Sequence, residues 1–288
     1  MKGVILAAGY GTRFLPVTKT IPKEMLPLVD LPAIELVTRE MISAGIKDIL
    51  IVSSRRKKPL EDYFDREVEL ETTFREENAG EKLRSIRPAN VNIFFMRQQQ
   101  MAGTGDALLL VEPFVDDSPF IVAYPDDVLI KGPSLSAQLM EHHQRTGAVV
   151  LAGREILEGD ISRYGVMDVE RRGGVEYVKA MVEKPLPGKE PSRLVGYGRY
   201  LYTPDLFPAL KATRSEKIQG EFTQTDALNR LALDGKVSVC RFEGKLLDVG
   251  TPQGYLEAII EYGLTRQEFR TQLLGFMKRV LVREEGAS

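Results

Sequence analysis

Residues 3–13 read Gly-Val-Ile-Leu-Ala-Ala-Gly-Tyr-Gly-Thr-Arg, and residues 21–27 read Ile-Pro-Lys-Glu-Met-Leu-Pro. The apolar run predicts a buried strand that leads into a glycine turn. Because the two glycines of Gly-Tyr-Gly lack a Cβ, the turn can take positive φ angles and its N–H groups can approach an anion. Arg13 and Lys23 can neutralise such an anion. These residues therefore predict a phosphate site at the end of the first strand.

A dinucleotide-binding Rossmann site is a much weaker interpretation of the same stretch. That site needs a third glycine at the start of a helix. Here Leu15-Pro16 and Pro22 would interrupt such a helix. A dehydrogenase is accordingly the least favoured function.

Bulk composition excludes several other classes of protein. The chain has 288 residues, with 39 Lys and Arg against 41 Asp and Glu, so a net charge of −2 does not favour nucleic-acid binding. Cys240 is the single cysteine, which excludes an intrachain disulfide, and the N-terminus has no signal-peptide pattern. No apolar run reaches the roughly 18–20 residues of a membrane span. We expect a cytoplasmic protein that binds neither nucleic acid nor membrane.

Periodicity predicts an α/β fold with a Rossmann-like mixed, mainly parallel sheet flanked by helices. Apolar runs typical of buried strands alternate with segments of helical period. Short segments in which apolar and polar residues alternate follow them, and this pattern indicates a hairpin-rich subregion. The expected strands are 3–8, 48–53, 91–96, 119–124 and 148–152; the expected helices are 33–44, 204–212 and 223–233; the hairpin-rich subregion spans about 160 to 202.

The length fits one large domain, residues 1–288. We expect residues 1–158 to be mainly nucleotide-binding, 159–250 mainly sugar-binding, and 251–288 to form C-terminal helices at 252–262 and 266–282. The last segment has an apolar stripe at helical spacing. Packing on the chain's own core is the ordinary interpretation of this stripe, and an oligomer contact in a dimer or tetramer is the alternative.

A specific resemblance extends through nearly the whole chain. The stretch Leu6-Ala-Ala-Gly-Tyr-Gly-Thr-Arg-Phe-Leu-Pro-Val-Thr-Lys-Thr-Ile-Pro-Lys-Glu-Met-Leu-Pro-Leu-Val29 resembles the signature of the sugar-1-phosphate nucleotidylyltransferases, and most closely that of the bacterial group that joins UTP to glucose 1-phosphate. Further matches follow in order at Pro125-Asp126, Tyr164-Gly165-Val166, Val182-Glu-Lys-Pro185, Thr225-Asp-Ala227 and Asp248-Val-Gly250.

The resemblance implies a Mg²⁺-dependent enzyme that makes UDP-glucose and pyrophosphate. Such a reaction brings two polyanions together, so cations must screen their repulsion. By resemblance, Arg13 and Lys23 line the triphosphate, and Asp126 and Asp248 hold Mg²⁺, which prefers few carboxylates plus phosphate oxygens and water. Asp127 is then expected to be a loop or capping residue.

Nucleotide and sugar contacts are also implied. A glutamine amide offers a donor and an acceptor to a pyrimidine edge, and backbone groups complete the pattern. An ordinary strand end or bend would explain the sugar-side motifs equally well. The implied nucleotide residues are Ala8, Gly9, Gly11, Gln98 and Gly103, and the implied sugar-phosphate residues are Gly165, Glu183 and Lys184.

Two departures from the uridylyl pattern keep dTTP open as a substrate. Gly103-Thr-Gly-Asp106-Ala replaces the usual Gly-Leu-Gly-His-Ala, and Asp248-Val-Gly-Thr251 is closer to the thymidylyltransferase Asp-Thr-Gly-Thr. A glucose-1-phosphate thymidylyltransferase and a non-catalytic nucleotide-sugar-binding paralogue therefore remain alternatives. For Glu221 and Asp226 we favour a structural role.

Two other features do not indicate sites. His142 and His143 are adjacent, so on a helix they diverge and lack ligand spacing; we expect them on a solvated face. Cys240 lies in a strand-like run with no histidine nearby in the sequence to activate it, so we expect a packed core thiol.

Overall fold

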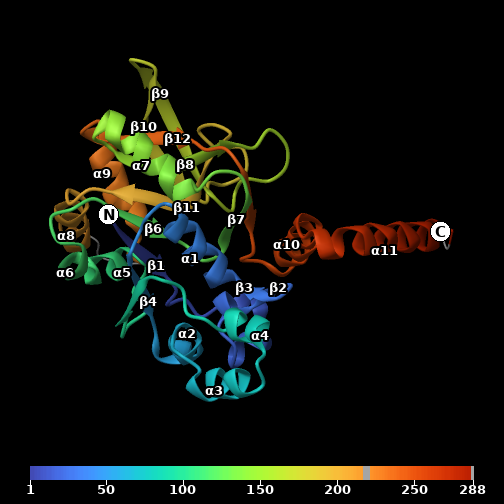
Figure 1. Cartoon of the computed structure of the whole chain (residues 1–288). Coiled ribbons are helices and arrows are strands. Elements are labelled where there is room, and N and C mark those ends of the chain that lie inside the picture. Colours follow the sequence, from blue (N-terminus) through green and yellow to red (C-terminus); the bar gives the residue numbers. More distant parts are fainter. Residues whose placement is uncertain (217–220, 287–288) are drawn as a thin grey trace.

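The structure, a computed structural model, describes residues 1–216 and 221–286 and is centred on one large sheet (Figure 1). Within those residues the sheet has nine strands in the order β5-β4-β1-β6-β11-β8-β12-β10-β9. The strands are β1 (Lys2–Leu6), β4 (Asp48–Ser53), β5 (Asn92–Arg97), β6 (Phe120–Ala123), β8 (Val149–Glu155), β9 (Gly165–Arg172), β10 (Val175–Glu183), β11 (Leu194–Tyr202) and β12 (Val237–Arg241).

The sheet is parallel in its first part and mixed in its second. Strands β5, β4, β1 and β6 are parallel neighbours. Strand β11 then runs antiparallel to both β6 and β8, β12 is parallel to β8, and the β9–β10 hairpin completes the sheet. The predicted mixed α/β fold is confirmed, and the hairpin-rich subregion lies at β9 to β11.

Helices cover both faces of the sheet. Alternate side chains of β1 point to opposite faces, so Val4 and Ile5 are both fully buried but belong to two separate apolar cores. The helices are α1 (Ala33–Ser43), α2 (Lys58–Phe64), α3 (Val68–Glu76), α4 (Gly80–Ser85), α5 (Thr104–Leu110), α6 (Glu112–Val115), α7 (Leu135–Thr146), α8 (Leu206–Glu216), α9 (Gln224–Leu233), α10 (Pro252–Thr265) and α11 (Gln267–Glu285), with short 3₁₀ turns at Thr12–Phe14, Val17–Lys19, Lys23–Met25 and Arg55–Lys57.

Two small ribbons lie outside the main sheet. Strand β2 (Pro27–Leu28) pairs with β3 (Leu31–Pro32), and β7 (Asp127–Lys131) pairs with β13 (Lys245–Asp248). The second ribbon corrects one expectation: Asp127 begins a strand rather than lying in a loop. Its partner in the antiparallel register is Asp248.

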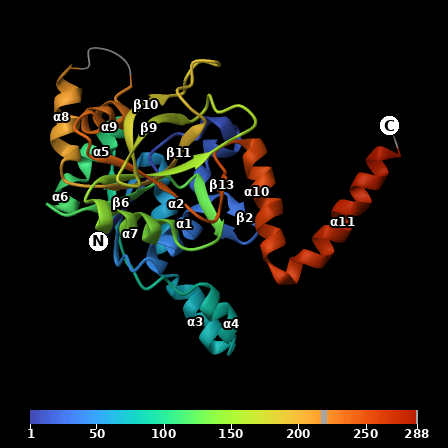
Figure 2. The same cartoon turned by 90° about the horizontal axis from the view of Figure 1, so that it is seen from above.

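The C-terminal helix α11 does not pack on the core. It projects away from the body of the molecule in both views (Figures 1 and 2) and contacts α10. None of its described residues is buried, and Phe276 and Leu281 are more than half exposed. The expected packing of this helix on the chain's own core is therefore wrong, because among the described residues its stripe contacts α10, where Leu273 lies against Gly263, and is otherwise largely uncovered. Residues 287–288 of the expected C-terminal segment lie outside the described residues.

Helices α3 and α4 form a second projection, which periodicity did not predict. They lie between β4 and β5 in the sequence and extend from the body beside α2 (Figure 2). Their main packing partners are each other. In the part of the chain that the structure covers, no helix is both long and apolar enough to cross a membrane.

The histidine expectation is only partly right. His142 is buried in α7 rather than solvated, and burial lowers its pKa. His143 Nδ1 lies 2.7 Å from the carbonyl oxygen of Ala148. Cys240 is buried, and burial raises the pKa of its thiol to about 11, as expected for a packed core thiol.

Candidate active site

A cavity of about 440 Å³ opens at the carboxyl ends of β1 and β6, where ligands collect in open α/β sheets. It brings together all five predicted nucleotide residues, together with Lys23 and Asp126. Its lining also includes residues for which the sequence indicated no contact or only a structural role. The lining is Leu6, Ala8, Gly9, Tyr10, Gly11, Thr12, Lys23, Glu24, Gln98, Met101, Gly103, Thr104, Ala107, Tyr124, Asp126 and Glu221.

The glycine turn has a positive φ at Gly11 and not at Gly9. Gly11 takes a left-handed conformation with φ 69°, and a Cβ on it would lie 3.2 Å from Lys23 Cβ. A Cβ on Gly9 would touch no atom within 4 Å, so packing does not require glycine there. Gly9 instead leaves the cavity wall open to a ligand.

Gln98 is buried, and its amide is held by the protein. Nε2 donates to the carbonyl oxygen of Gly103 and to Asp106 Oδ2, each at 3.1 Å. Asp106 is itself paired with Arg214, whose Nη1 lies 3.4 Å from Oδ1. This arrangement fixes the amide with its donor occupied, which leaves Oε1 to accept from a ligand.

Packing explains why residue 103 is a glycine. A Cβ there would lie 2.2 Å from the carbonyl oxygen of Phe222, and φ is 110°. The backbone of Phe222 bonds to this loop on both sides, accepting from Gly105 N and donating to the carbonyl oxygen of Ala102. The same segment brings Glu221 to the cavity wall, a contact that the expected structural role did not include.

Lys23 and Asp126 form an ion pair at the edge of the cavity. Burial alone would lower the pKa of Lys23, but Asp126 and Glu24 outweigh it and raise the pKa. The ammonium is therefore charged at neutral pH. The sequence analysis assigned Lys23 to the triphosphate and Asp126 to Mg²⁺, and it did not predict that the two side chains touch.

Asp126 and Asp248 converge on one small space. A Cβ on Gly250 would lie 2.8 Å from Asp126 Oδ2 and 3.0 Å from Asp248 Oδ1. The β7–β13 ribbon produces this approach, since Val249 N donates to the carbonyl oxygen of Asp126. Hard carboxylate oxygens that face one small space are the kind of ligand that Mg²⁺ prefers. Because no cluster of three or more potential side-chain ligands occurs among the described residues, the ion's other ligands would be phosphate oxygens and water.

Asp127, the residue after Asp126, is hydrogen-bonded to strand β11. Its Oδ2 accepts from Gly198 N at 2.6 Å, and a Cβ on Gly198 would collide with it. Burial and the nearby Asp248 raise the pKa of Asp127 to about 7. The residue thus ties the ribbon to β11.

Two arginines lie at the same edge. Arg13 Nη1 donates to the carbonyl oxygen of Gly250 at 3.3 Å, so Arg13 stands beside the aspartates and is not part of the cavity wall. Arg163 Nη2 lies 3.9 Å from Asp248 Oδ2, and its guanidinium sits over the Tyr164 ring. Arg163 was not predicted as a site residue from the sequence, although it directly precedes Tyr164-Gly165, one of the motifs that match the family.

The predicted sugar-phosphate residues form a separate group. Gly165 is paired with Glu183 in the β9–β10 hairpin, and Lys184 Nζ lies 3.5 Å from Glu183 Oε1. Tyr124 connects this group with the cavity. It lines the cavity, its ring packs edge-on against Tyr200, and burial raises the pKa of its phenol.

A buried ion pair lies beneath the cavity. Lys57 Nζ donates to Glu24 Oε2 at 2.6 Å, and both side chains are at most 3% exposed. Burial raises the pKa of Glu24 and lowers that of Lys57. Glu24 follows Lys23 directly and lines the cavity, so this pair holds the backbone that carries the cation.

Comparison with known proteins agrees with this geometry. The family model described as Nucleotidyl transferase matches residues 2–263. The chain belongs to the nucleotidyl transferase family. This nucleotidyl transferase is 39% identical over 282 residues to UTP–glucose-1-phosphate uridylyltransferase 2 of Staphylococcus saprophyticus, with 97% of each chain covered. It is 39% identical over 286 residues to the uridylyltransferase YngB of Bacillus subtilis, covering 98% of this chain and 96% of that protein.

Solved structures give the same result. A UDP-glucose pyrophosphorylase complexed with UDP-glucose matches with a TM-score of 0.80 and 40% identity, covering 92% of this nucleotidyl transferase and 99% of that chain. A UTP-bound enzyme from Acinetobacter baumannii matches with a TM-score of 0.85 and 32% identity, covering 97% and 98%. The predicted fold and family are thereby confirmed.

Proposed function

We propose that this nucleotidyl transferase transfers a uridylyl group from UTP to α-D-glucose 1-phosphate and releases pyrophosphate. The observation that carries the proposal is the cavity that collects Gln98, Gly103 and the glycine turn on one side and the Lys23–Asp126 pair on the other. The relatives named uridylyltransferases match over nearly their whole length, which supports the same activity.

The reaction is a direct displacement. An oxygen of the sugar phosphate attacks the α-phosphorus of UTP, the new P–O bond forms, and the bond to the β-phosphate oxygen breaks with pyrophosphate as the leaving group. We assign Arg13 and Lys23 to neutralise the triphosphate, and Glu183, Gly165 and Lys184 to hold the sugar phosphate. Fixed cations act most strongly where negative charge redistributes in the transition state.

Asp126 and Asp248 would hold Mg²⁺. When bound, the ion would neutralise phosphate charge and orient the phosphates. Until a ligand arrives, Lys23 provides the countercharge for Asp126. We infer that the lysine moves from the carboxylate to phosphate oxygens when nucleotide and metal bind.

The hydrogen bonds that Gln98 can offer do not by themselves select between uracil and thymine. With its donor occupied by Gly103 and Asp106, Gln98 offers an acceptor to the pyrimidine edge, where uracil and thymine both carry an N–H. Gln98 can therefore accept a hydrogen bond from this N–H of uracil and of thymine alike, and it does not separate the two. The 5-methyl group and the ribose 2′-hydroxyl must decide the preference.

We expect UTP with glucose 1-phosphate to give the highest kcat/KM in a pyrophosphate-release assay across a matrix of nucleoside triphosphates and sugar phosphates. A tenfold or greater advantage of dTTP, equal to ~1.4 kcal/mol, would identify a thymidylyltransferase instead. Nucleotide binding without pyrophosphate release would identify the non-catalytic paralogue.

The two lysines should separate kinetically. We expect Lys184→Ala to raise mainly the KM for glucose 1-phosphate, because an exposed group beside Glu183 acts as a ground-state anchor. Lys23→Ala should mainly lower kcat, because its charge meets the reacting phosphates. Steady-state kinetics with each substrate varied checks both. Equal and small effects in the two variants would make both lysines ordinary surface groups.

We further propose a homo-oligomer, dimer or tetramer, that covers the exposed apolar stripe of α11. Among the described residues this 19-residue helix packs mainly on α10, and Phe276 of its apolar stripe is more than half exposed, so a second copy of the chain would bury apolar surface that this chain leaves in water. Residues 1–158 would serve mainly the nucleotide, 159–250 mainly the sugar, and 251–288 the assembly of subunits. The single cysteine suits a cytoplasmic enzyme.

A further inference from the structure

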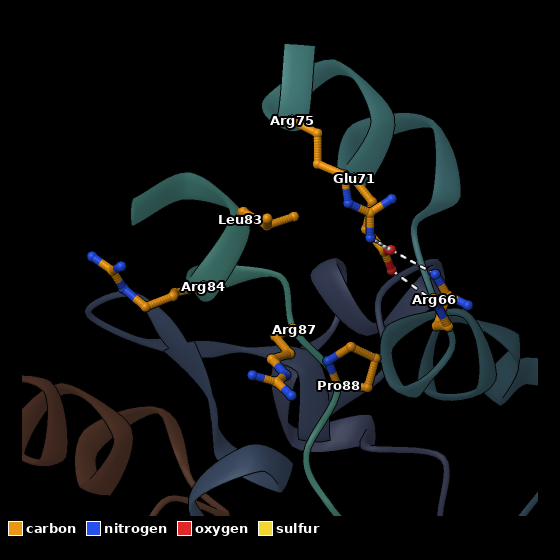
Figure 3. A pocket seen from close by; sticks show the side chains of 7 residues that line it. All are labelled: Arg66, Glu71, Arg75, Leu83, Arg84, Arg87 and Pro88. Atoms are coloured by element: carbon orange, nitrogen blue, oxygen red, sulfur yellow. Dashed lines mark hydrogen bonds and ion pairs between the residues drawn. The ribbon is translucent and has the colours of Figure 1, made fainter. Parts of the chain in front are cut away.

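A second cavity, of about 360 Å³, lies in the α3–α4 projection, away from the residues of the candidate active site. Figure 3 shows its lining from close by. Four of the seven lining residues are arginines and one is a glutamate. The lining is Arg66, Glu71, Arg75, Leu83, Arg84, Arg87 and Pro88.

Glu71 organises two of these arginines. Arg66 donates from Nε and Nη2 to the two carboxylate oxygens, at 3.0 and 2.6 Å, and Arg75 Nη2 donates to Oε2 at 2.8 Å. The Glu71 side chain is only 7% exposed, and these hydrogen bonds, first that of Arg66, lower its pKa to about 2. Glu71 is therefore ionised at any physiological pH and holds both guanidinium groups in fixed positions.

The cavity keeps an excess of positive charge after this pairing. A guanidinium has five N–H donors, so Arg66 and Arg75 each retain donors beyond those used on Glu71. Arg87 stands on the facing wall beside Pro88 (Figure 3), and within residues 1–216 and 221–286 its side chain has no ion-pair or hydrogen-bond partner. Arg84 extends away from Glu71 in the same view and belongs to the rim.

Local packing does not account for this arrangement. Val68 and Leu70 of α3 are 60% and 41% exposed, so neither side chain is buried against the rest of the molecule. Several like charges around one hollow repel one another, and one carboxylate offsets only part of that repulsion. The planar forks of arginine match phosphate oxygens bidentately, while Leu83 and Pro88 supply an apolar surface beside them.

We propose that this arginine cavity binds a phosphate-bearing small molecule at a site separate from the catalytic cavity. Arg66 and Arg75, fixed by Glu71, contact the phosphate from one wall, and Arg87 contacts it from the other. The ligand adds bonds between α3 and the segment after α4, so it orders the projection. The pyrophosphate or nucleotide of the enzyme's own reaction carries such a phosphate group, and so does any other phosphorylated metabolite.

Hydrogen exchange of the full chain tests the proposal. Pyrophosphate, UTP and inorganic phosphate are titrated separately, and amide protection is followed in peptides from 68–85 and, for the catalytic cavity, from 98–107. We expect protection in 68–85, with a half-saturating concentration about tenfold higher in Arg87→Gln, the effect of losing one charge-assisted contact. The probe that acts at the lowest concentration identifies the source of the phosphate.

The matched control is Arg171→Gln, which removes an exposed arginine of β9 that has no side-chain ion pair among the described residues. It should leave the half-saturating concentration unchanged. Arg87→Gln should also leave the response of peptides 98–107 unchanged, which separates this site from the catalytic cavity. The proposal is overturned if no probe protects 68–85 at millimolar concentrations, or if protection there is the same in Arg87→Gln.

Discussion

Asp126→Asn and Asp248→Asn should each lower kcat by at least about 10²-fold while the protein remains folded. The substitution keeps the shape of the side chain and deletes one negative charge at the space beside Gly250 where both carboxylates converge. A loss of this order is typical when one preorganised electrostatic group is removed from a transition-state site. Pyrophosphate release at saturating UTP and glucose 1-phosphate, followed over a range of Mg²⁺ concentrations, measures it.

Excess Mg²⁺ should restore only part of the rate in either variant, because the remaining carboxylate holds the ion less well in the productive position. Chelation of divalent cations should abolish turnover of the unsubstituted enzyme. Asp168→Asn is the matched control, since Asp168 pairs with Lys179 at the exposed surface and should leave kcat unchanged. Variants of Asp126 and Asp248 that turn over as fast as this control would exclude a shared metal site.

The sequence predicted those parts of the site that depend on local chain geometry. The glycine turn directly follows the first strand, and Gln98 and Gly103 are five positions apart, so the chain limits the distance within each group, whereas the family resemblance is what assigned the two groups to one nucleotide site. The structure brings all of them to one cavity. The apolar runs likewise predicted β1, β4, β5, β6 and β8, although β5 is a half-exposed strand at the edge of the sheet rather than the buried strand that was expected.

What the sequence did not predict depends on pairing over long separations. Asp127 became a strand residue because β7 pairs with β13, more than 100 positions later, and not because of its own neighbours. Arg163 reaches Asp248 through the same long-range arrangement. Helices α3 and α4 have one buried residue between them, Glu71, so no buried apolar face identifies them. Helix α11 has an apolar stripe in its sequence but no buried residue among those described.

The Lys57–Glu24 pair is another such long-range contact, and its disruption should have the largest effect on stability. We expect Lys57→Met to lower the free energy of unfolding by about 3–5 kcal/mol, because it removes the hydrogen-bonded partner of the buried Glu24 carboxylate. It leaves that carboxylate only the charge of Lys23, which is already paired with Asp126. Glu24 Oε1 already lacks a hydrogen-bond partner among the described residues, so the carboxylate depends on Lys57 for its compensation. Urea unfolding followed by circular dichroism gives the value.

Lys58→Met is the matched control, since the next residue is also a lysine but is exposed, and its loss should change the free energy by no more than about 0.5 kcal/mol. The double variant Glu24→Met with Lys57→Met should recover most of the lost stability, because two apolar side chains can replace a buried pair at little cost. Turnover of the double variant then separates the two roles of the pair. If the pair also fixes the backbone that presents Lys23, the stable double variant has a lower kcat, whereas a wild-type kcat would restrict the pair to stability. A Lys57→Met protein as stable as Lys58→Met would contradict the argument, since it would mean that Glu24 is not held as a buried charge.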